Sequence, residues 1–223
     1  MAKNKLPSPA ASGVNFEQAI EGIYESLEIS FFSPLEKHRT IGFVAPHPKD
    51  GNTTAVIAAG YYLSKHLNAP TLIIDGNSLN HGLSRIYGLA DQPGFSDPIK
   101  ADLDAIESII YKPSAPFDIL PYGLNQCEAS IDDRRRHLQD LLNYLESRYT
   151  YVLFDSCALS ALPASLVYLT IFQGVILTIK CEDTKWETAQ HLKRAVMDAG
   201  GNTIGVILNQ MKNYIPKSLN NWV

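Results

Sequence analysis

Short, unbroken apolar runs alternate along this chain with longer segments whose apolar residues recur every three or four positions. Such periodic segments favour helices, and uninterrupted apolar runs favour buried strands. Strands of this kind are covered on both faces, and a helix between two of them implies a right-handed crossover and parallel pairing. The sequence therefore predicts an α/β fold, a doubly wound, mostly parallel sheet with helices on both faces. The expected strands are 40–45, 70–75, 117–121, 151–155, 174–179 and 204–209, and the expected helices are 53–67, 78–87, 131–148 and 184–199.

The N-terminal part of the chain differs in composition from the rest. Residues 1–14 are rich in Pro, Ser, Ala and Gly, which predicts a disordered leader. Residues 16–31 carry an apolar stripe at helical spacing, which predicts an amphipathic helix that docks on the core or on another subunit. A chain of 223 residues can bury one large core, so residues 15–223 are expected to form a single domain.

Composition narrows the functional classes. A net charge of −4 and a pI near 5.8 argue against a nucleic-acid-binding protein. The only tight basic cluster, at residues 134–136, is expected on a solvated helix face, with a phosphate or partner contact as the alternative. No run approaches the ~20 apolar residues that span a bilayer, so no direct membrane insertion is expected. The widely spaced Cys127, Cys157 and Cys181 predict reduced thiols and a cytoplasmic protein.

Candidate chemistry gathers where strands 40–45, 70–75 and 151–155 end, which is the edge where ligands bind in such sheets. Gly51 lets the backbone approach a phosphate, and Thr53 and Thr54 open a helix whose unpaired N–H groups favour an anion. Thr53 also stands where a P-loop hydroxyl would hold Mg²⁺.

Asp75 and Asp155 each end an apolar strand. A charge there is costly unless a cation or hydrogen bonds meet it. Both aspartates are therefore candidate catalytic residues, and Asp155 together with Thr53 is a candidate metal site. The alternative is that each aspartate only caps the helix that follows.

At these motifs the chain resembles the cytosolic domain of bacterial tyrosine kinases (BY-kinases), the polysaccharide-associated autokinases related to the MinD and ParA ATPases. The segment PKDGNTTAVIAAGYYL corresponds to the family's Walker A region, TLIIDGNSLNHGLSRIYGL to Walker A′ and YTYVLFDS to Walker B. The segment GGNTIGVILNQMKNYIPKSL corresponds to the last strand and tail. The resemblance covers about residues 16–219. It implies a P-loop NTPase-like fold, ATP or ADP with Mg²⁺ as cofactors, and a position for Asn209 beside the nucleotide base.

The chain departs from the family at polar positions that contact the nucleotide in active members. Asn52 replaces the Walker A lysine, which neutralises charge on the β and γ phosphates during transfer. A loss of ~3 kcal/mol of transition-state stabilisation slows chemistry about a hundredfold. Asp50 is expected to add negative charge near the phosphates, and Lys49 to lie on the wrong side of the glycine turn. Turnover is therefore expected to be absent or feeble, with any weak nucleotide binding resting on Gly51, Asn52, Thr53, Thr54 and Asn209.

The N-terminal helix and the C-terminal tail bear on how the protein assembles with other subunits. Active family members carry two arginines on the first helix that join subunits into a ring, and Glu25 and Glu28 occupy those positions here. This reversal of charge disfavours an octameric ring and leaves a homodimer open. The resemblance implies a partner in the same pathway, a membrane polysaccharide co-polymerase or an intact kinase, at the inner face of the membrane. Tyr214 is expected to be a packing residue, with a phosphorylation site as the alternative.

These observations favour a catalytically degenerate BY-kinase-like protein, a pseudokinase that regulates exopolysaccharide or capsule biosynthesis or export through protein contacts. One alternative is an active tyrosine autokinase or ATPase of the same system in which Lys49 replaces the missing lysine. Another is a MinD/ParA-like ATP switch, although that group's signature lysine would fall at His47.

Overall fold

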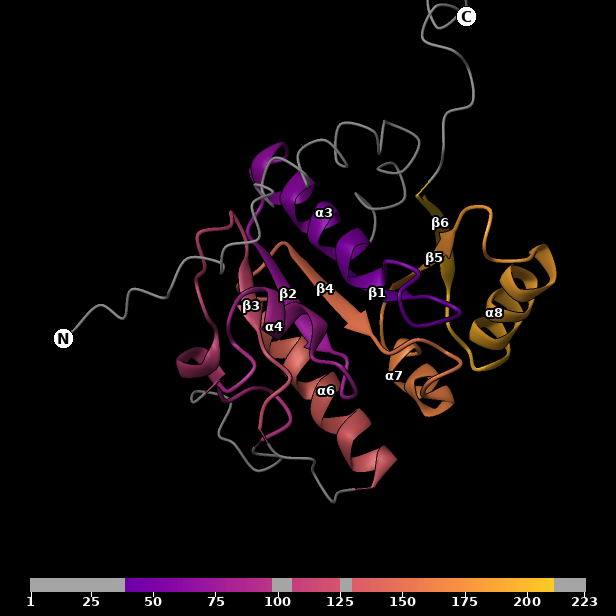
Figure 1. Cartoon of the computed structure of the whole chain (residues 1–223). Coiled ribbons are helices and arrows are strands. Elements are labelled where there is room, and N and C mark those ends of the chain that lie inside the picture. Colours follow the sequence, from indigo (N-terminus) through magenta and orange to yellow (C-terminus); the bar gives the residue numbers. More distant parts are fainter. Residues whose placement is uncertain (1–38, 98–105, 125–129, 211–223) are drawn as a thin grey trace, which may run out of the picture.

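One six-stranded parallel sheet forms the centre of the protein, as the computed structural model shows for residues 39–97, 106–124 and 130–210 (Figure 1). The strand order is β3-β2-β4-β1-β5-β6, and every neighbouring pair is parallel. The predicted α/β fold is confirmed. The strands are β1 Thr40–Val44, β2 Thr71–Gly76, β3 Asp118–Leu120, β4 Tyr151–Ser156, β5 Gly174–Lys180 and β6 Thr203–Asn209.

The helices cover both faces of this sheet (Figure 1). None of the helices among the described residues is both long and apolar enough to cross a membrane. The predicted leader, the amphipathic segment 16–31 with Glu25 and Glu28, and Cys127 and Tyr214 lie outside the described residues. The helices are α3 Asn52–Lys65, α4 Gly82–Ile86, α6 Ile131–Leu145, α7 Leu166–Leu169 and α8 Trp186–Asp198, with short 3-10 helices η1 Glu107–Ile109 and η2 Pro163–Ser165.

The sheet separates two apolar clusters. Alternate residues of a strand point to opposite faces, so on β4 Leu153 joins one cluster, and Val152 and Phe154 join the other. The first cluster includes the buried side chains of α3, and the second includes those of α6, α7 and α8. This two-sided burial explains why the strands read as unbroken apolar runs.

One helix is shorter in the structure than the sequence predicts. The prediction covered residues 78–87, whereas α4 spans only Gly82–Ile86. Asn77 Oδ1 accepts hydrogen bonds from the backbone N–H groups of Leu79 and Asn80 at 3.3 and 3.1 Å, which holds this segment in a turn. Side chains of this type compete with the helical backbone in this way.

Helix α6 shows how a local signal and core packing act together. Ser130 caps the helix by accepting a hydrogen bond from Asp133 N at 3.1 Å, and Asp132 and Asp133 complement the positive end of the helix dipole. One face then buries Leu138, Leu141, Leu142 and Leu145 against the sheet. This face fixes where the first turn of α6 stands relative to the carboxyl ends of β2 and β4.

Truncation of this buried face should destabilise the protein strongly. Leu141→Ala removes a fully buried side chain, and we expect a loss of about 2–5 kcal/mol in the free energy of unfolding. The exposed neighbour Asp140→Ala is the matched control and should change stability by less than about 0.5 kcal/mol. Urea unfolding measures both, and similar effects of the two substitutions would contradict this packing.

Candidate functional site

A pocket of about 430 Å³ opens at the carboxyl edge of the sheet, between the start of α3 and the loop that follows β2. This volume lies within the range of about 300–1,000 Å³ that is usual for small-molecule sites. The pocket therefore lies where the sequence analysis expected a phosphate. Its lining includes His47, Lys49, Gly51, Asn52, Thr53, Thr54, Asn77, Asn80, Ser156 and Asn209.

The turn before α3 is held by Asn209 at the end of β6. Asn209 Nδ2 donates a hydrogen bond to the carbonyl oxygen of Asp50 at 2.8 Å. Gly51 has φ 94°, and a Cβ added there would lie 1.8 Å from Asn209 Nδ2. Glycine is thus required both by the left-handed backbone and by the close approach of the amide. The structure shows that Asn209 anchors the loop, and its place beside a nucleotide base stays a prediction.

Two neighbouring side chains of the loop are oriented differently from the sequence expectation. Asp50 is buried and does not line the pocket, because its Oδ2 accepts a hydrogen bond from His47 N at 3.0 Å and closes the loop on itself. Lys49 has φ 71°, and this left-handed residue turns the chain so that the exposed lysine lines the pocket. The expectation that Lys49 lies on the wrong side of the glycine turn is therefore wrong.

Asn52 lines the pocket, yet its amide is directed into the sheet. Nδ2 lies 2.9 Å from Asp155 Oδ1, 3.0 Å from the Phe43 carbonyl oxygen and 3.3 Å from the Ser156 carbonyl oxygen. All three partners are acceptors, which fixes the nitrogen rather than the oxygen at this position. Both amide hydrogens are thereby used within the protein, and the side chain has no donor left for a phosphate.

Asp155 is completely buried at the end of β4 and binds the first turn of α3. Thr53 Oγ1 donates a hydrogen bond to its Oδ2 at 2.7 Å, and Asn52 occupies its Oδ1. Burial, followed by the charge of Asp75, raises the pKa of Asp155 to about 7, although the bonds from Thr53 and Asn52 act against this rise. Thr53 faces the pocket, whereas Asp155 does not line it.

Asp75 lies directly across the β2–β4 pair from Asp155 and is equally buried. Its Oδ2 accepts hydrogen bonds from Ser84 N and Ser84 Oγ at 2.8 and 2.6 Å, and its Oδ1 accepts one from Asn77 N at 3.1 Å. Burial raises the pKa of this carboxyl, while these hydrogen bonds oppose the rise. The structure thus brings both predicted aspartates together but places neither in the lining of the pocket.

Sequence reasoning missed several groups at this site. Asn80 and Gly82 line the pocket, and Ser84 of α4 holds Asp75. A Cβ at Gly82 would lie 2.9 Å from Thr53 Oγ1, so this glycine lets α4 approach α3 closely. These residues lie within the helix that was predicted over residues 78–87, and nothing in that prediction indicated a contact with Thr53.

Comparisons with known proteins bear on the family resemblance and on the fold. No protein-family profile matches the chain. The Staphylococcus aureus protein CapB, which is named as a tyrosine-protein kinase, is 24% identical over 141 residues, which are 63% of this chain and 62% of CapB. The match therefore spans less than two thirds of that relative.

Solved structures share the fold. The kinase domain of VpsO superposes with a TM-score of 0.74 at 18% identity and covers 89% of this chain and 100% of that domain. The cell division ATPase MinD of Pyrococcus furiosus superposes with a TM-score of 0.59 at 20% identity, and the match covers 81% of this chain and 77% of MinD. Cobyrinic acid a,c-diamide synthase of Mycobacterium smegmatis, solved with ADP and magnesium, superposes with a TM-score of 0.58 at 18% identity. The match covers 76% of this chain and 72% of the synthase. The chain therefore shares its fold with a tyrosine-kinase-type domain and with MinD, in agreement with the resemblance found in the sequence.

The turn at Gly51 offers a stability test. Gly51→Ala places a side chain in a left-handed conformation, which costs about 1–2 kcal/mol, and also forces Asn209 to move. Gly88→Ala is the matched control, because Gly88 has φ 68° but no atom within 4 Å of an added Cβ. We expect Gly51→Ala to lower the free energy of unfolding more than Gly88→Ala does. Adding Asn209→Ala should recover part of the difference, and equal losses would contradict the close approach.

Asp155 should also make stability depend on pH. The native state holds its proton up to a pH of about 7, whereas the unfolded state releases it near 3.8, so the native state binds more protons in between. Stability should therefore fall as pH rises through this window, by up to about 1.4 kcal/mol per pH unit for this group.

Asp155→Asn should make the dependence of the unfolding free energy on pH shallower. Part of the dependence should remain, because the pKa of Asp75 is also raised. The exposed Asp140→Asn serves as the control and should retain the wild-type profile. Urea unfolding between pH 4 and 8 measures the slopes, and an unchanged slope in Asp155→Asn would show that Asp155 is ionised in the native protein.

Proposed function

We propose that this chain is a catalytically degenerate BY-kinase-like protein that acts through protein contacts. The main support is the side chain of Asn52, whose Nδ2 is bound to Asp155 and to the Phe43 carbonyl oxygen instead of facing a phosphate. The kinase name of CapB and the resemblance to polysaccharide-associated autokinases favour a role in exopolysaccharide or capsule biosynthesis or export.

The energetic argument concerns the charge that a phosphoryl group gains during transfer. A cation about 4 Å away in a partly desolvated site is worth ~4 kcal/mol before desolvation costs. Asn52 brings no charge, and both hydrogens of its amide are used inside the protein. A deficit of even ~3 kcal/mol slows transfer about a hundredfold.

Weak nucleotide binding remains compatible with the geometry. The first backbone N–H groups of α3 have no partner within the helix, and they open onto a pocket of sufficient volume. Thr53 Oγ1 and Asp155 Oδ2 are the groups that would meet Mg²⁺, which supplies charge neutralisation when bound. Because Asp155 does not line the pocket, it would act through Thr53 or through water.

The partner that we propose is a membrane polysaccharide co-polymerase or an intact kinase of the same pathway. This places the protein in the cytoplasm at the inner face of the membrane, held there by the partner. Support comes from the resemblance and from Glu25 and Glu28, whose negative charge disfavours the ring of active kinases and fits a basic surface. A homodimer remains compatible with this assignment.

Lys49 favours a second candidate function, an active autokinase or ATPase. Lys49 is exposed and lines the pocket, so its ammonium group can reach a bound phosphate. Its long side chain would then take the part of the missing Walker A lysine. Catalysis would also require Asp75 or Asp155 to become accessible to the nucleotide.

Measured turnover separates the two functions. We expect phosphate release and tyrosine phosphorylation by the purified chain with ATP and Mg²⁺ to stay at least about a hundredfold below those of an intact BY-kinase. Lys49→Gln should leave this low rate unchanged. Turnover close to that of an intact kinase, abolished by Lys49→Gln but not by the exposed control Lys193→Gln, would establish the alternative and overturn the pseudokinase proposal.

A further inference from the structure

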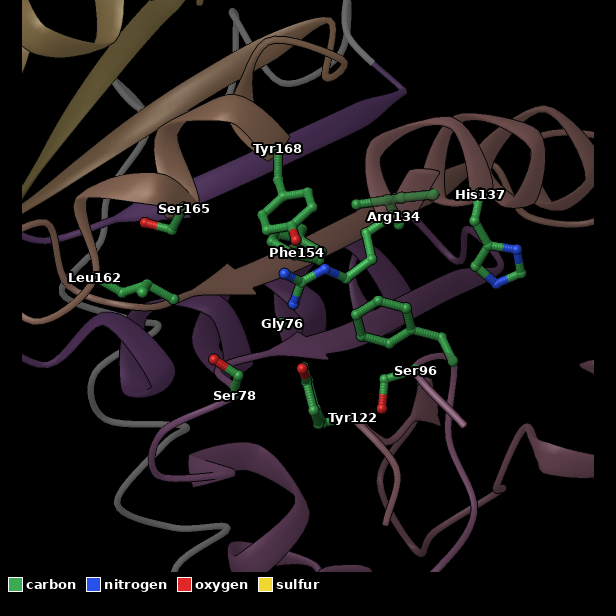
Figure 2. Close-up of a pocket in the computed structure, with 12 residues that line it drawn as sticks. Gly76, Ser78, Ser96, Tyr122, Arg134, His137, Phe154, Leu162, Ser165 and Tyr168 are labelled. Atoms are coloured by element: carbon green, nitrogen blue, oxygen red, sulfur yellow. The ribbon is translucent and has the colours of Figure 1, made fainter. Parts of the chain in front are cut away.

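A second, smaller cavity lies on the other face of the sheet, where β2 and β4 end beside the first turn of α6 (Figure 2). Its volume is about 50 Å³, and its lining shares no residue with that of the larger pocket. It is therefore a separate site rather than an extension of the candidate nucleotide site. Its lining combines apolar side chains such as Phe154 with the polar side chains of Ser78, Tyr122, Arg134 and His137.

Arg134 is the dominant charge in this cavity. Its side chain extends from α6 into the cavity among the aromatic rings (Figure 2). Its Nε is buried and has no hydrogen-bond partner among the described residues. No carboxylate lines the cavity, and the lining residue His137 is basic as well. The guanidinium is hydrogen-bonded with the Tyr122 hydroxyl, but this neutral group does not compensate its charge. A buried Nε donor without an acceptor, in a cavity lined by no carboxylate, is unfavourable, so this arrangement favours an anionic ligand.

The remaining polar groups of the lining suit the same ligand. The lining brings in the hydroxyl groups of Ser78, Ser96, Ser165, Tyr122 and Tyr168, although that of Ser165 donates to the Cys157 carbonyl oxygen at 3.5 Å. Burial raises the pKa of Tyr122 although hydrogen bonds with Ser78 and Arg134 oppose the rise, so this hydroxyl is neutral and already belongs to a polar network around Arg134. A planar guanidinium surrounded by hydroxyls matches the geometry of carboxylate and phosphate oxygens.

The cavity volume limits the size of the ligand. One water molecule needs roughly 10–15 Å³ by this measure, so about 50 Å³ accommodates roughly three to five heavy atoms. Phosphate and acetate are of this size, and a nucleotide is not.

We propose that this cavity binds a small oxyanion, either a phosphate or a carboxylate group, with the Arg134 side chain as its principal ligand. The group can belong to a free ion or to the end of a larger molecule whose remainder projects through the opening. Arg134 thereby differs from its neighbours in the basic cluster. Arg136 is exposed and pairs with Asp133 at 2.9 Å, and Arg135 is exposed beside Thr170.

Nuclear magnetic resonance on the full chain provides a direct test. The probes are inorganic phosphate and acetate, added in the millimolar range to ¹⁵N-labelled protein with sodium chloride at equal ionic strength as the blank. We expect a saturable shift of the Arg134 Nε–Hε resonance with at least one probe. The probe with the lower Kd shows whether the cavity prefers phosphate or carboxylate. Titration with an aryl phosphate and with benzoate then shows whether the cavity also binds an anionic group that carries a larger substituent.

Matched variants locate the anion. Anion-dependent thermal stabilisation should be present in the wild type and in Arg136→Gln, which removes an exposed charge from the same helix. It should be at least about tenfold weaker in Arg134→Gln, because the charge-assisted bonds are lost. Arg134→Lys keeps the charge and should retain part of the response.

Two results would overturn the proposal. One is the absence of a saturable shift of the Arg134 resonance with both probes, a measurement that does not depend on any variant. The other is an anion response that persists unchanged in Arg134→Gln, which would place the anion elsewhere, for example at the start of α3.

Discussion

The buried carboxylate of Asp155 determines how the first turn of α3 stands on the sheet. Its two oxygens accept hydrogen bonds from consecutive residues, Asn52 Nδ2 at 2.9 Å and Thr53 Oγ1 at 2.7 Å. Asp75, opposite on the neighbouring strand, is held in the same manner by Ser84 of α4. Each helix that borders the pocket is thus attached to the sheet by one aspartate, because a buried carboxylate without donors would be costly.

This network explains why the substitution at position 52 changes the role of the residue. A lysine side chain is long enough to pass the loop and reach a phosphate, whereas an asparagine side chain is short and finds acceptors within the protein. Asn52 uses both amide hydrogens on Asp155 and on the Phe43 carbonyl oxygen. This arrangement has an energetic cost, because Asn52 Oδ1 is buried without a hydrogen-bond partner among the described residues. The residue thus stabilises the closed turn and supplies no positive charge to the pocket.

The sequence predicted the sheet because two-sided burial produces unbroken apolar runs, and it predicted the position of the pocket because strand ends share one edge. It could not predict side-chain direction. Lys49 and Gly51 both have positive φ, and the turn they form is held by Asn209, which is far away in the sequence. Arg134 likewise looked like one member of an exposed basic cluster. Only the packing of α6 against the sheet shows that it enters a cavity.

The segment after β2 connects the two cavities. Gly76, the last residue of β2, and Ser78 line the small cavity, and Asn77 between them lines the larger one. The segment has little freedom, because a Cβ at Gly76 would lie 2.0 Å from the ring of Phe154. The Cys157 thiol lies between its two sides, 3.4 Å from Asn77 Oδ1 and 3.6 Å from Ser78 Oγ. The segment therefore forms part of the wall of both cavities.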